Sequence, residues 1–200
     1  MADVDLYLDP VCPFSWVTAR WLLDAGHATD TPVALRQMSL AVLNEGQDAD
    51  DKQRHMMERS TRLGRLFAAA VGERGPEVFA GLYASIGRRI HVDGEDLTAP
   101  AVRAALAENG LAEHLAEAQD DSGLDEAVKQ AHQASQDALG DEAGSPIIAV
   151  DGRAFSGPVL TRTLKTPDAV RLLEAVFTMA AIPEFAALQR PYEGPPTIEA

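Results

Sequence analysis

The sequence predicts an α/β fold in which a small sheet is interrupted by a long helical segment. Three observations predict it: a β-α-β pattern at the start of the chain, amphipathic helical patterns through its middle, and a β-β-α pattern at its end. The 200 residues are 46% hydrophobic. A chain of this length and composition can bury a substantial core, which argues against a disordered or fibrous protein.

The opening of the chain has the pattern of a β-α-β unit. Apolar and polar side chains alternate over residues 4–8, and we expect this strand to end at Asp9-Pro10, because proline cannot continue a ladder. Apolar side chains then recur at helical spacing from residue 14 or 15 to residue 24, with Ala25-Gly26 as the predicted stop. Residues 32–40 read as a second strand, and this order favours a parallel pair.

The middle of the chain, from about residue 50 to residue 139, changes to amphipathic helices. Thr98 with Pro100 resembles a helix start, and Asn109-Gly110 and Gly140 resemble helix ends. We expect four or five helices here. Their apolar stripes comprise Leu63, Leu66, Phe67 and Val71, then Phe79, Leu82, Tyr83, Ile86 and Ile90, and finally Leu124, Val128, Ala131 and Leu139.

The end of the chain predicts a hairpin and a helix. Asp151-Gly152 lies between two strand-like runs, residues 146–150 and 153–156, and Asp-Gly readily supplies the positive φ angles of a tight hairpin turn. A last helix opens at Thr166-Pro167 and ends before Pro183.

We therefore expect three parts. Residues 1–48 give a strand, a helix and a strand, residues 49–140 give a helical insertion, and residues 141–200 give the hairpin, the last helix and a tail. The tail, from Arg190 onward, is rich in proline and is expected to be loose.

Charge and composition exclude several classes of function. The formal net charge of -14 and the pI near 4.6 repel nucleic-acid phosphates and anionic lipids, so we expect neither as a partner. The longest apolar runs are far shorter than the roughly 20 residues that cross a bilayer. Residues 1–9 lack the basic start and apolar stretch of a secretory signal, so a cytoplasmic location is expected. The preference for arginine over lysine and the many alanines suggest a bacterial source rich in G+C.

The chain has one cysteine, Cys12, which excludes an intramolecular disulfide and a thiolate zinc site. The five histidines are scattered without metal-type spacing, so we expect no metal, and we interpret His132 as a half-buried histidine at a helix interface.

Cys12 lies between the first strand and the first helix. Unpaired N–H groups and the positive end of the helix dipole favour a thiolate there, so we expect the pKa of Cys12 to fall. Pro13 suits the first turn of the helix, and the Ser15 hydroxyl can donate to the sulfur as a neutral substitute for a second thiol. The competing interpretation is that Cys12 is a small buried hydrophobe.

The run Asp9-Pro10-Val11-Cys12-Pro13-Phe14-Ser15-Trp16 resembles the DsbA-like branch of the thioredoxin superfamily. More narrowly, the chain is similar to the mycothiol-dependent reductases of that branch, sometimes described as nitroreductases. The likeness is carried by Trp21, Gly144-Ser145-Pro146, the run Phe155-Ser156-Gly157-Pro158-Val159-Leu160, and the segment from Pro183-Glu184-Phe185 to Leu188-Gln189-Arg190. The resemblance implies a thioredoxin-like fold with a large helical insertion.

The resemblance also implies a site. Pro146 corresponds to the cis-proline that lies against the active-site sulfur, and the Ser145 backbone would then pair with a bound thiol or peptide. Ser15 stands where dithiol members have their second cysteine, which implies a monothiol cycle with an outside thiol, mycothiol first and glutathione next. The resulting site residues are Cys12 and Ser15 as catalytic groups, with Pro13, Phe14, Trp16, Ser145 and Pro146 binding the thiol or a small hydrophobic or disulfide substrate.

Two alternatives stay open. The Pro-Phe-Ser-Trp sequence is also similar to kappa-class glutathione transferases and hydroxychromene-carboxylate isomerases, in which Cys12 and Ser15 would only activate a bound thiol cofactor. A non-catalytic member that binds thiols or peptides is the second. The aromatic side chains of Phe14 and Trp16 stay candidates for a substrate cleft, whereas Trp21 and Tyr83 have the spacing of core residues. A homodimer is also left open.

Overall fold

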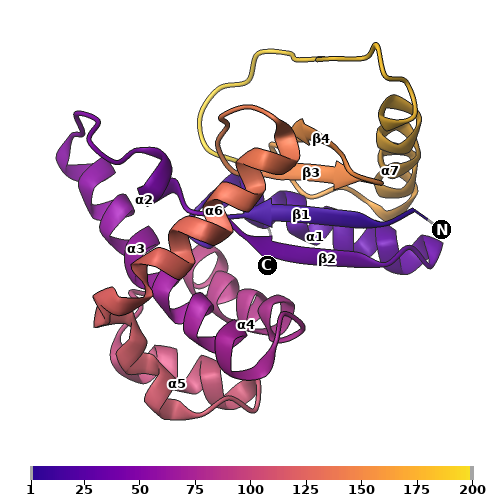
Figure 1. Cartoon of the computed structure of the whole chain (residues 1–200). Helices are drawn as coiled ribbons and strands as arrows, with labels where there is room; N and C mark the ends of the chain where they lie inside the picture. The colour runs from indigo at the N-terminus through magenta and orange to yellow at the C-terminus, as the bar shows by residue number, and fades with distance from the viewer. Residues whose placement is uncertain (1, 199–200) are drawn as a thin grey trace.

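The chain folds around one mixed sheet. Its computed structural model describes residues 2–198, and within that range the strands lie in the order β2-β1-β3-β4 (Figure 1). β1 runs parallel to β2 and antiparallel to β3, and β3 runs antiparallel to β4, so that Leu6 faces Leu35 on one side and Ile148 on the other. The strands are β1 (Val4–Leu8), β2 (Val33–Gln37), β3 (Ile147–Val150) and β4 (Arg153–Ser156).

Two helices cover one face of the sheet. They are α1 (Pro13–Thr29) and α7 (Thr166–Ala180), which pack against each other, and the Trp21 indole N–H donates to the Ala169 carbonyl oxygen at 2.9 Å. The alternation of β1 places Val4, Leu6 and Leu8, all fully buried, in the core cluster with these helices. The predicted β-α-β opening and β-β-α ending are thus present.

The segment between β2 and β3 is helical, as expected. Five α-helices lie in this described part of the chain, the last of which, α6, packs against β2, β3 and β4 (Figure 1). The helices are α2 (Leu40–Leu43), α3 (Asp51–Arg74), α4 (Val78–Gly87), which continues into a π-helical turn (Arg88–Val92), α5 (Ala99–Glu108) and α6 (Asp125–Leu139), with 3-10 turns at Glu113–Asp120 and Ser122–Leu124. The proposed division at residues 48/49 and 140/141 stays a prediction.

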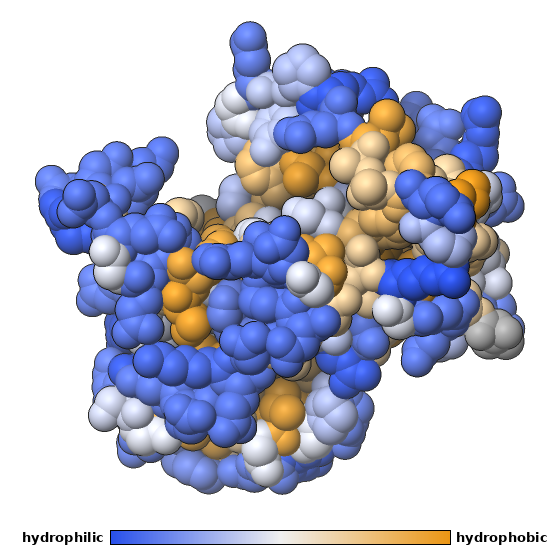
Figure 2. All heavy atoms as spheres, turned by 45° about the horizontal axis from the view of Figure 1, so that its top comes forward, coloured by the Kyte–Doolittle hydropathy of each residue, from blue (hydrophilic) through white to orange (hydrophobic). Residues whose placement is uncertain are grey.

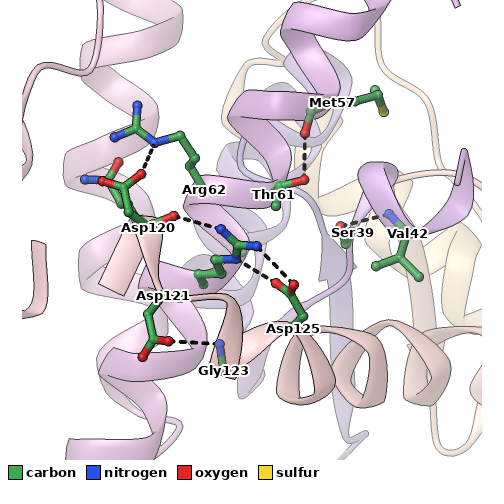
Figure 3. A network of polar contacts seen from close by, with 12 residues as sticks. Ser39, Val42, Met57, Thr61, Arg62, Asp120, Asp121, Gly123 and Asp125 are labelled. Carbon is green, nitrogen blue, oxygen red and sulfur yellow. Dashed lines mark hydrogen bonds and ion pairs between the residues drawn. The ribbon is translucent and has the colours of Figure 1, made fainter. Parts of the chain in front are cut away.

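Ion pairs close the helical segment onto itself. On α3, Arg62 forms an ion pair with Asp120. Arg65 donates two hydrogen bonds to the Asp125 carboxylate, at 2.6 and 3.0 Å. Figure 3 shows Asp120, Asp121 and Asp125 gathered at the start of α6 beside Arg62. These contacts fix α6 relative to α3, and the Ser60 hydroxyl of α3 donates to Asp9 in the loop that follows β1.

Two sequence predictions need correction. α1 does not stop at Ala25-Gly26 but continues to Thr29, and Asp30 in the left-handed conformation ends the helix. Gly26 lies inside the helix, where a Cβ would collide with Val33 and Thr31, so this glycine serves close packing and not helix termination. The tail is not wholly loose, since the Thr197 amide donates to the Thr161 carbonyl at 2.8 Å and Pro196 is buried. The C-terminal segment therefore returns from α7 across the top of the sheet (Figure 1).

The surface reflects the composition. Most of the face in Figure 2 is hydrophilic, in keeping with the net charge of -14. None of the helices between residues 2 and 198 combines the length and the apolar character that a bilayer crossing requires.

Candidate active site

Cys12 is the N-cap residue of α1, directly before the helix begins. Its backbone is extended (φ -78°, ψ 115°), its amide donates to the Asp9 carbonyl at 3.1 Å, and its own carbonyl accepts the Trp16 amide at 3.1 Å. Pro13 follows as the first helical residue, where its missing N–H costs nothing. The strand-to-helix corner expected from the sequence is therefore present, with the sulfur at the helix N-terminus.

Ser145 lies directly against the sulfur. The Cys12 thiol donates to the Ser145 carbonyl oxygen at 3.3 Å, although the two residues are 133 positions apart in the chain. The antiparallel pairing of β1 with β3 brings them together. Tyr7 near the end of β1 faces Ile147 at the start of β3, Cys12 follows shortly after β1, and Ser145 lies shortly before β3. The Ser145–Pro146 bond is cis, the geometry that the family resemblance implies.

A pair of serine hydroxyls lies beside this contact. The Oγ atoms of Ser15 and Ser145 are 2.5 Å apart, and the Asp9 amide donates to the Ser145 hydroxyl at 2.8 Å. Ser15 is completely buried. The hydroxyl of Ser145 thus links the loop before Cys12 to the first turn of α1.

Asp9 supplies a buried carboxylate next to the corner. It accepts hydrogen bonds from the amides of Val11 and Leu40 at 2.9 and 2.7 Å and from the Ser60 hydroxyl at 2.5 Å. Burial raises the pKa of Asp9, and these three hydrogen bonds oppose the rise. The carboxylate therefore ties the Cys12 loop to α2 and α3 of the helical segment.

An aromatic wall closes the side of the site toward α4. The Trp16 ring stacks on His91 (centroids 5.7 Å apart) and lies 5.8 Å from Tyr83, while the Arg20 guanidinium lies over its ring. The His91 Nε2 lies 2.9 Å from the Pro10 carbonyl oxygen. Burial lowers the pKa of His91 to about 4, so at neutral pH the ring is neutral and its Nε2–H donates to that carbonyl.

Comparisons with known proteins agree with this geometry. Residues 11–190 match the family model described as "Rv2466c-like: Mycothiol-dependent nitroreductase Rv2466c". The chain belongs to the Rv2466c-like family. It is also 31% identical over 196 residues, 96% of this chain and 83% of the other, to the uncharacterized protein Rv2286c of Mycobacterium tuberculosis. The thioredoxin-like fold with a helical insertion, expected from the sequence, is that of DsbA-like solved structures.

Solved structures support the fold. A probable DsbA oxidoreductase of Streptomyces coelicolor superposes with a TM-score of 0.60 at 17% identity, covering 96% of this chain and 94% of that one. The cytosolic disulfide reductase DsbM of Pseudomonas aeruginosa, solved with GSH, has a TM-score of 0.54 at 19% identity, covering 88% of this chain and 99% of that one. At these identities the likeness concerns the fold alone.

The sequence predicts that the pKa of Cys12 falls in this member of the Rv2466c-like family, and that direction is wrong. Burial raises the pKa of the Cys12 thiol, whose residue is only 6% exposed, and hydrogen bonding to Ser15 opposes this rise, while the Asp9 charge adds to it. A helix N-terminus favours the thiolate and lowers the pKa of a cysteine, but at Cys12 the loss of water around the sulfur has the larger effect. In the arrangement described here the thiol is held protonated and donates to Ser145.

The two aromatic residues predicted as candidates for a substrate cleft, Phe14 and Trp16, lie in different surroundings. Trp16 is 5% exposed and packs into the wall described above, so it does not face an open cleft. Phe14 is half-buried and meets Tyr192 of the C-terminal segment edge to face, with centroids 5.2 Å apart. Phe14 thus joins the first turn of α1 to the C-terminal segment.

Sequence reasoning missed three residues of this site. Asp9 was interpreted as a strand end, although a carboxylate three residues before the cysteine is the one signal that points to it. Ser60 and His91 lie on helices of the insertion, and nothing in the sequence indicates that these helices reach the corner. His132, 6% exposed, is more buried than expected. No group of three or more His, Cys, Asp or Glu side chains in residues 2–198 has the arrangement of a metal site.

Proposed function

We propose that the protein is a thiol-dependent oxidoreductase that works through one sulfur, Cys12, and takes its second thiol from outside the chain. The observation that carries this proposal is the place of Cys12: the sole cysteine of the sequence begins a helix, with its sulfur 3.3 Å from the carbonyl of the residue before Pro146. Ser15, three residues on, cannot form an internal disulfide.

The proposed cycle has two exchange steps. In the first, the Cys12 thiolate attacks one sulfur of a substrate disulfide, a Cys12–sulfur bond forms, and the other sulfur leaves as a thiolate that takes a proton from water. In the second, an external thiolate attacks the substrate sulfur of this mixed disulfide, Cys12 leaves as a thiolate, and the product is a disulfide between the substrate fragment and the external thiol. A second external thiolate then attacks the external-thiol sulfur of this product, which releases the fragment as a thiol and forms the disulfide of the external thiol. The two electrons that reduce the substrate thus come from two external thiols, and Cys12 is unchanged over the cycle.

The residues around the sulfur support both steps. The helix N-terminus and Ser15 stabilise negative charge on Cys12 whenever it attacks or leaves. We assign the binding surface to Pro13, Phe14, Ser145 and Pro146, with Trp16 as a buried supporting side chain behind it. When Cys12 gives up its proton, the Ser145 carbonyl loses its donor and becomes available to a substrate N–H.

Mycothiol is the proposed external thiol. The family description names mycothiol, and the site fits an external thiol because the chain has no second cysteine to resolve a mixed disulfide. Glutathione is the next candidate, since DsbM was solved with it. We place the protein in the reducing cytoplasm, and its substrate is a small disulfide or a small hydrophobic molecule.

The test is capture of the mixed disulfide. The protein is incubated with oxidised mycothiol and, separately, with oxidised glutathione above pH 8.5, near the ordinary thiol pKa, and the intact mass is measured. The expected result is one thiol adduct per chain that reduced thiol removes, formed more readily with mycothiol. Cys12→Ser removes the only acceptor and gives no adduct.

Ser15→Cys is the matched variant. Its second thiol attacks the Cys12 mixed disulfide, so the adduct is replaced by a chain that has lost two hydrogens. No adduct on the wild-type protein at any pH contradicts the proposal. A Cys12→Ser variant that still turns over with a reduced thiol supports the transferase or isomerase alternative instead.

A further inference from the structure

The peptide group between Pro10 and Val11 is held at both ends. Its N–H, from Val11, donates to the Asp9 carboxylate at 2.9 Å, and its carbonyl, from Pro10, accepts from the His91 Nε2 at 2.9 Å. This peptide is the central one of the turn that the Cys12 amide closes by donating to the Asp9 carbonyl at 3.1 Å. Cys12 is thus the last residue of a turn whose middle is fixed from two directions.

The two hydrogen bonds determine where the turn delivers Cys12. The proline ring fixes the φ of Pro10 at about -65°. The place of Cys12 after β1 then depends on the ψ of Pro10 and on the φ and ψ of Val11, and rotation of the peptide between these two residues changes the ψ of the first and the φ of the second. Because Asp9 and His91 hold the two ends of that peptide, they restrict both angles.

The two groups come from different parts of the chain. Asp9 belongs to the turn itself, whereas His91 lies 81 positions after Pro10, in the π-helical turn that continues α4. Turns of this kind inside helices frequently occur at functional sites. This one occurs where the helix meets Trp16: Gly87 lies directly against the Trp16 ring, and the His91 ring stacks on it with centroids 5.7 Å apart. The stacking holds the imidazole within reach of the turn.

The protonation of His91 suits a lasting donor. A carbonyl can only accept, so the Nε2 atom carries the proton in the contact with Pro10. Burial lowers the pKa of His91 to about 4, which leaves the ring neutral at neutral pH. The hydrogen bond is therefore made without burying a charge.

We propose that His91 is a positioning residue, whose hydrogen bond to the Pro10 carbonyl holds the Cys12 sulfur in its covered place against the Ser145 carbonyl. This inference rests on the proposed function and deepens it, because exchange at the sulfur depends on where the sulfur lies. Burial is the largest cause of the raised pKa of Cys12, so a sulfur released from this place gains water and ionises more easily. In this role His91 transfers no proton and contacts no substrate.

Three variants at His91 separate the donor from the ring. His91→Gln loses the ring but keeps an N–H donor at about the reach of Nε2, and His91→Asn carries the same amide on a side chain shorter by a methylene. His91→Phe keeps a ring for Trp16 and loses the donor. The rate of Cys12 alkylation by iodoacetamide is measured against pH for each variant, and urea unfolding checks that each is folded.

We expect His91→Asn and His91→Phe to behave alike. The midpoint of alkylation should move to lower pH, and the rate at pH 7 should rise by about fivefold, the effect of one neutral hydrogen bond. His91→Gln should keep the wild-type profile. If only the ring mattered, His91→Gln and His91→Asn would change together and His91→Phe would match wild type. That grouping, or any other than the expected one, overturns the inference.

His55→Phe is the matched control. His55 is an exposed residue of α3, and this variant should keep the wild-type alkylation profile. A second measurement needs no variant: nitrogen NMR of isotope-labelled histidine should show the His91 ring as the Nε2–H tautomer at pH 7, with that proton protected from exchange. A ring with its proton on Nδ1 contradicts the donation to Pro10.

The proposed function is judged separately by the mixed-disulfide adduct. If the wild-type protein forms that adduct and His91→Phe keeps the wild-type alkylation profile, only the role of His91 is refuted. If His91→Phe shows the expected shift and no adduct forms on wild type, the positioning of Cys12 stands and the proposed function fails.

Discussion

The Cys12 thiol donates to the Ser145 carbonyl oxygen, and this contact joins the first helix to the strand that follows the entire helical insertion. It holds the sulfur in a protonated resting state. The sulfur is protonated, almost covered and directed at an acceptor. To act as a nucleophile, the sulfur must lose its proton. The thiolate then needs hydrogen-bond donors in place of the Ser145 carbonyl, which is an acceptor.

Ser15→Ala should make Cys12 harder to ionise. Hydrogen bonding to Ser15 lowers the pKa of Cys12 against the larger effect of burial, so removing the hydroxyl leaves burial less opposed. The midpoint of alkylation against pH should lie above that of a free thiol in the wild-type protein and higher still in Ser15→Ala. A midpoint well below that of a free thiol in the wild-type protein would contradict the resting state described here.

Ser145→Ala should destabilise the fold. Without the Ser145 hydroxyl, the Asp9 amide and the buried Ser15 hydroxyl lose partners at 2.8 and 2.5 Å, and unpaired buried groups cost about 1–3 kcal/mol. Urea unfolding measures the loss. Ser156→Ala, at an exposed position of β4, is the control and should change stability by less than about 0.5 kcal/mol. Equal effects of the two variants would mean that the serine pair contributes nothing.

Gly87→Ala should disturb the aromatic wall. A Cβ at Gly87 would collide with the Trp16 ring, so the ring must move, and overpacking of this kind costs about 1–3 kcal/mol. Gly72→Ala is the matched control, because this helical glycine has no described atom within 4 Å of the new Cβ. It should stabilise α3 by roughly 0.5–1 kcal/mol. Denaturant unfolding distinguishes the two, and a neutral Gly87→Ala would show that Trp16 has room to shift.

Stability should depend on His91 below neutral pH. Burial lowers the pKa of His91 from 6.5 to about 4, with the Pro10 hydrogen bond opposing and the Arg59 charge adding to the fall. The unfolded chain therefore binds more protons between pH 6.5 and 4, and the stability present above pH 6.5 is lost as the pH falls through this window, by about 2 kcal/mol at pH 5.

The measurement compares wild type with His91→Gln by urea unfolding at pH 7 and pH 5. The raised pKa of Asp9 acts with the opposite sign, since a buried carboxylate favours the folded state once it is protonated, so the difference between the two proteins is the informative quantity. His91→Gln should lose less stability on acidification than wild type. An identical loss would mean that His91 is not the group that titrates.

Local patterns in the sequence determined the elements and the position of the sulfur. Alternation over residues 4–8, the Cys12-Pro13 start of α1 and the Asp151-Gly152 turn depend on nearest neighbours in the chain, and the structure has all three. The family resemblance predicted Pro146 against the sulfur, and the structure has the carbonyl of the preceding residue, Ser145, in contact with it.

The tertiary structure alone decided the environment of that sulfur. Whether a helix N-terminus lowers a pKa depends on how much water is left around the group. The residues that pack around the start of α1 come from distant segments: Ser145 before β3, Tyr83 and His91 in the helical insertion, and Tyr192 in the tail. Desolvation and cross-chain hydrogen bonds are properties of packing and have no local signal. The sequence therefore located the sulfur at a helix N-terminus, and the packing of distant segments determined that it rests protonated.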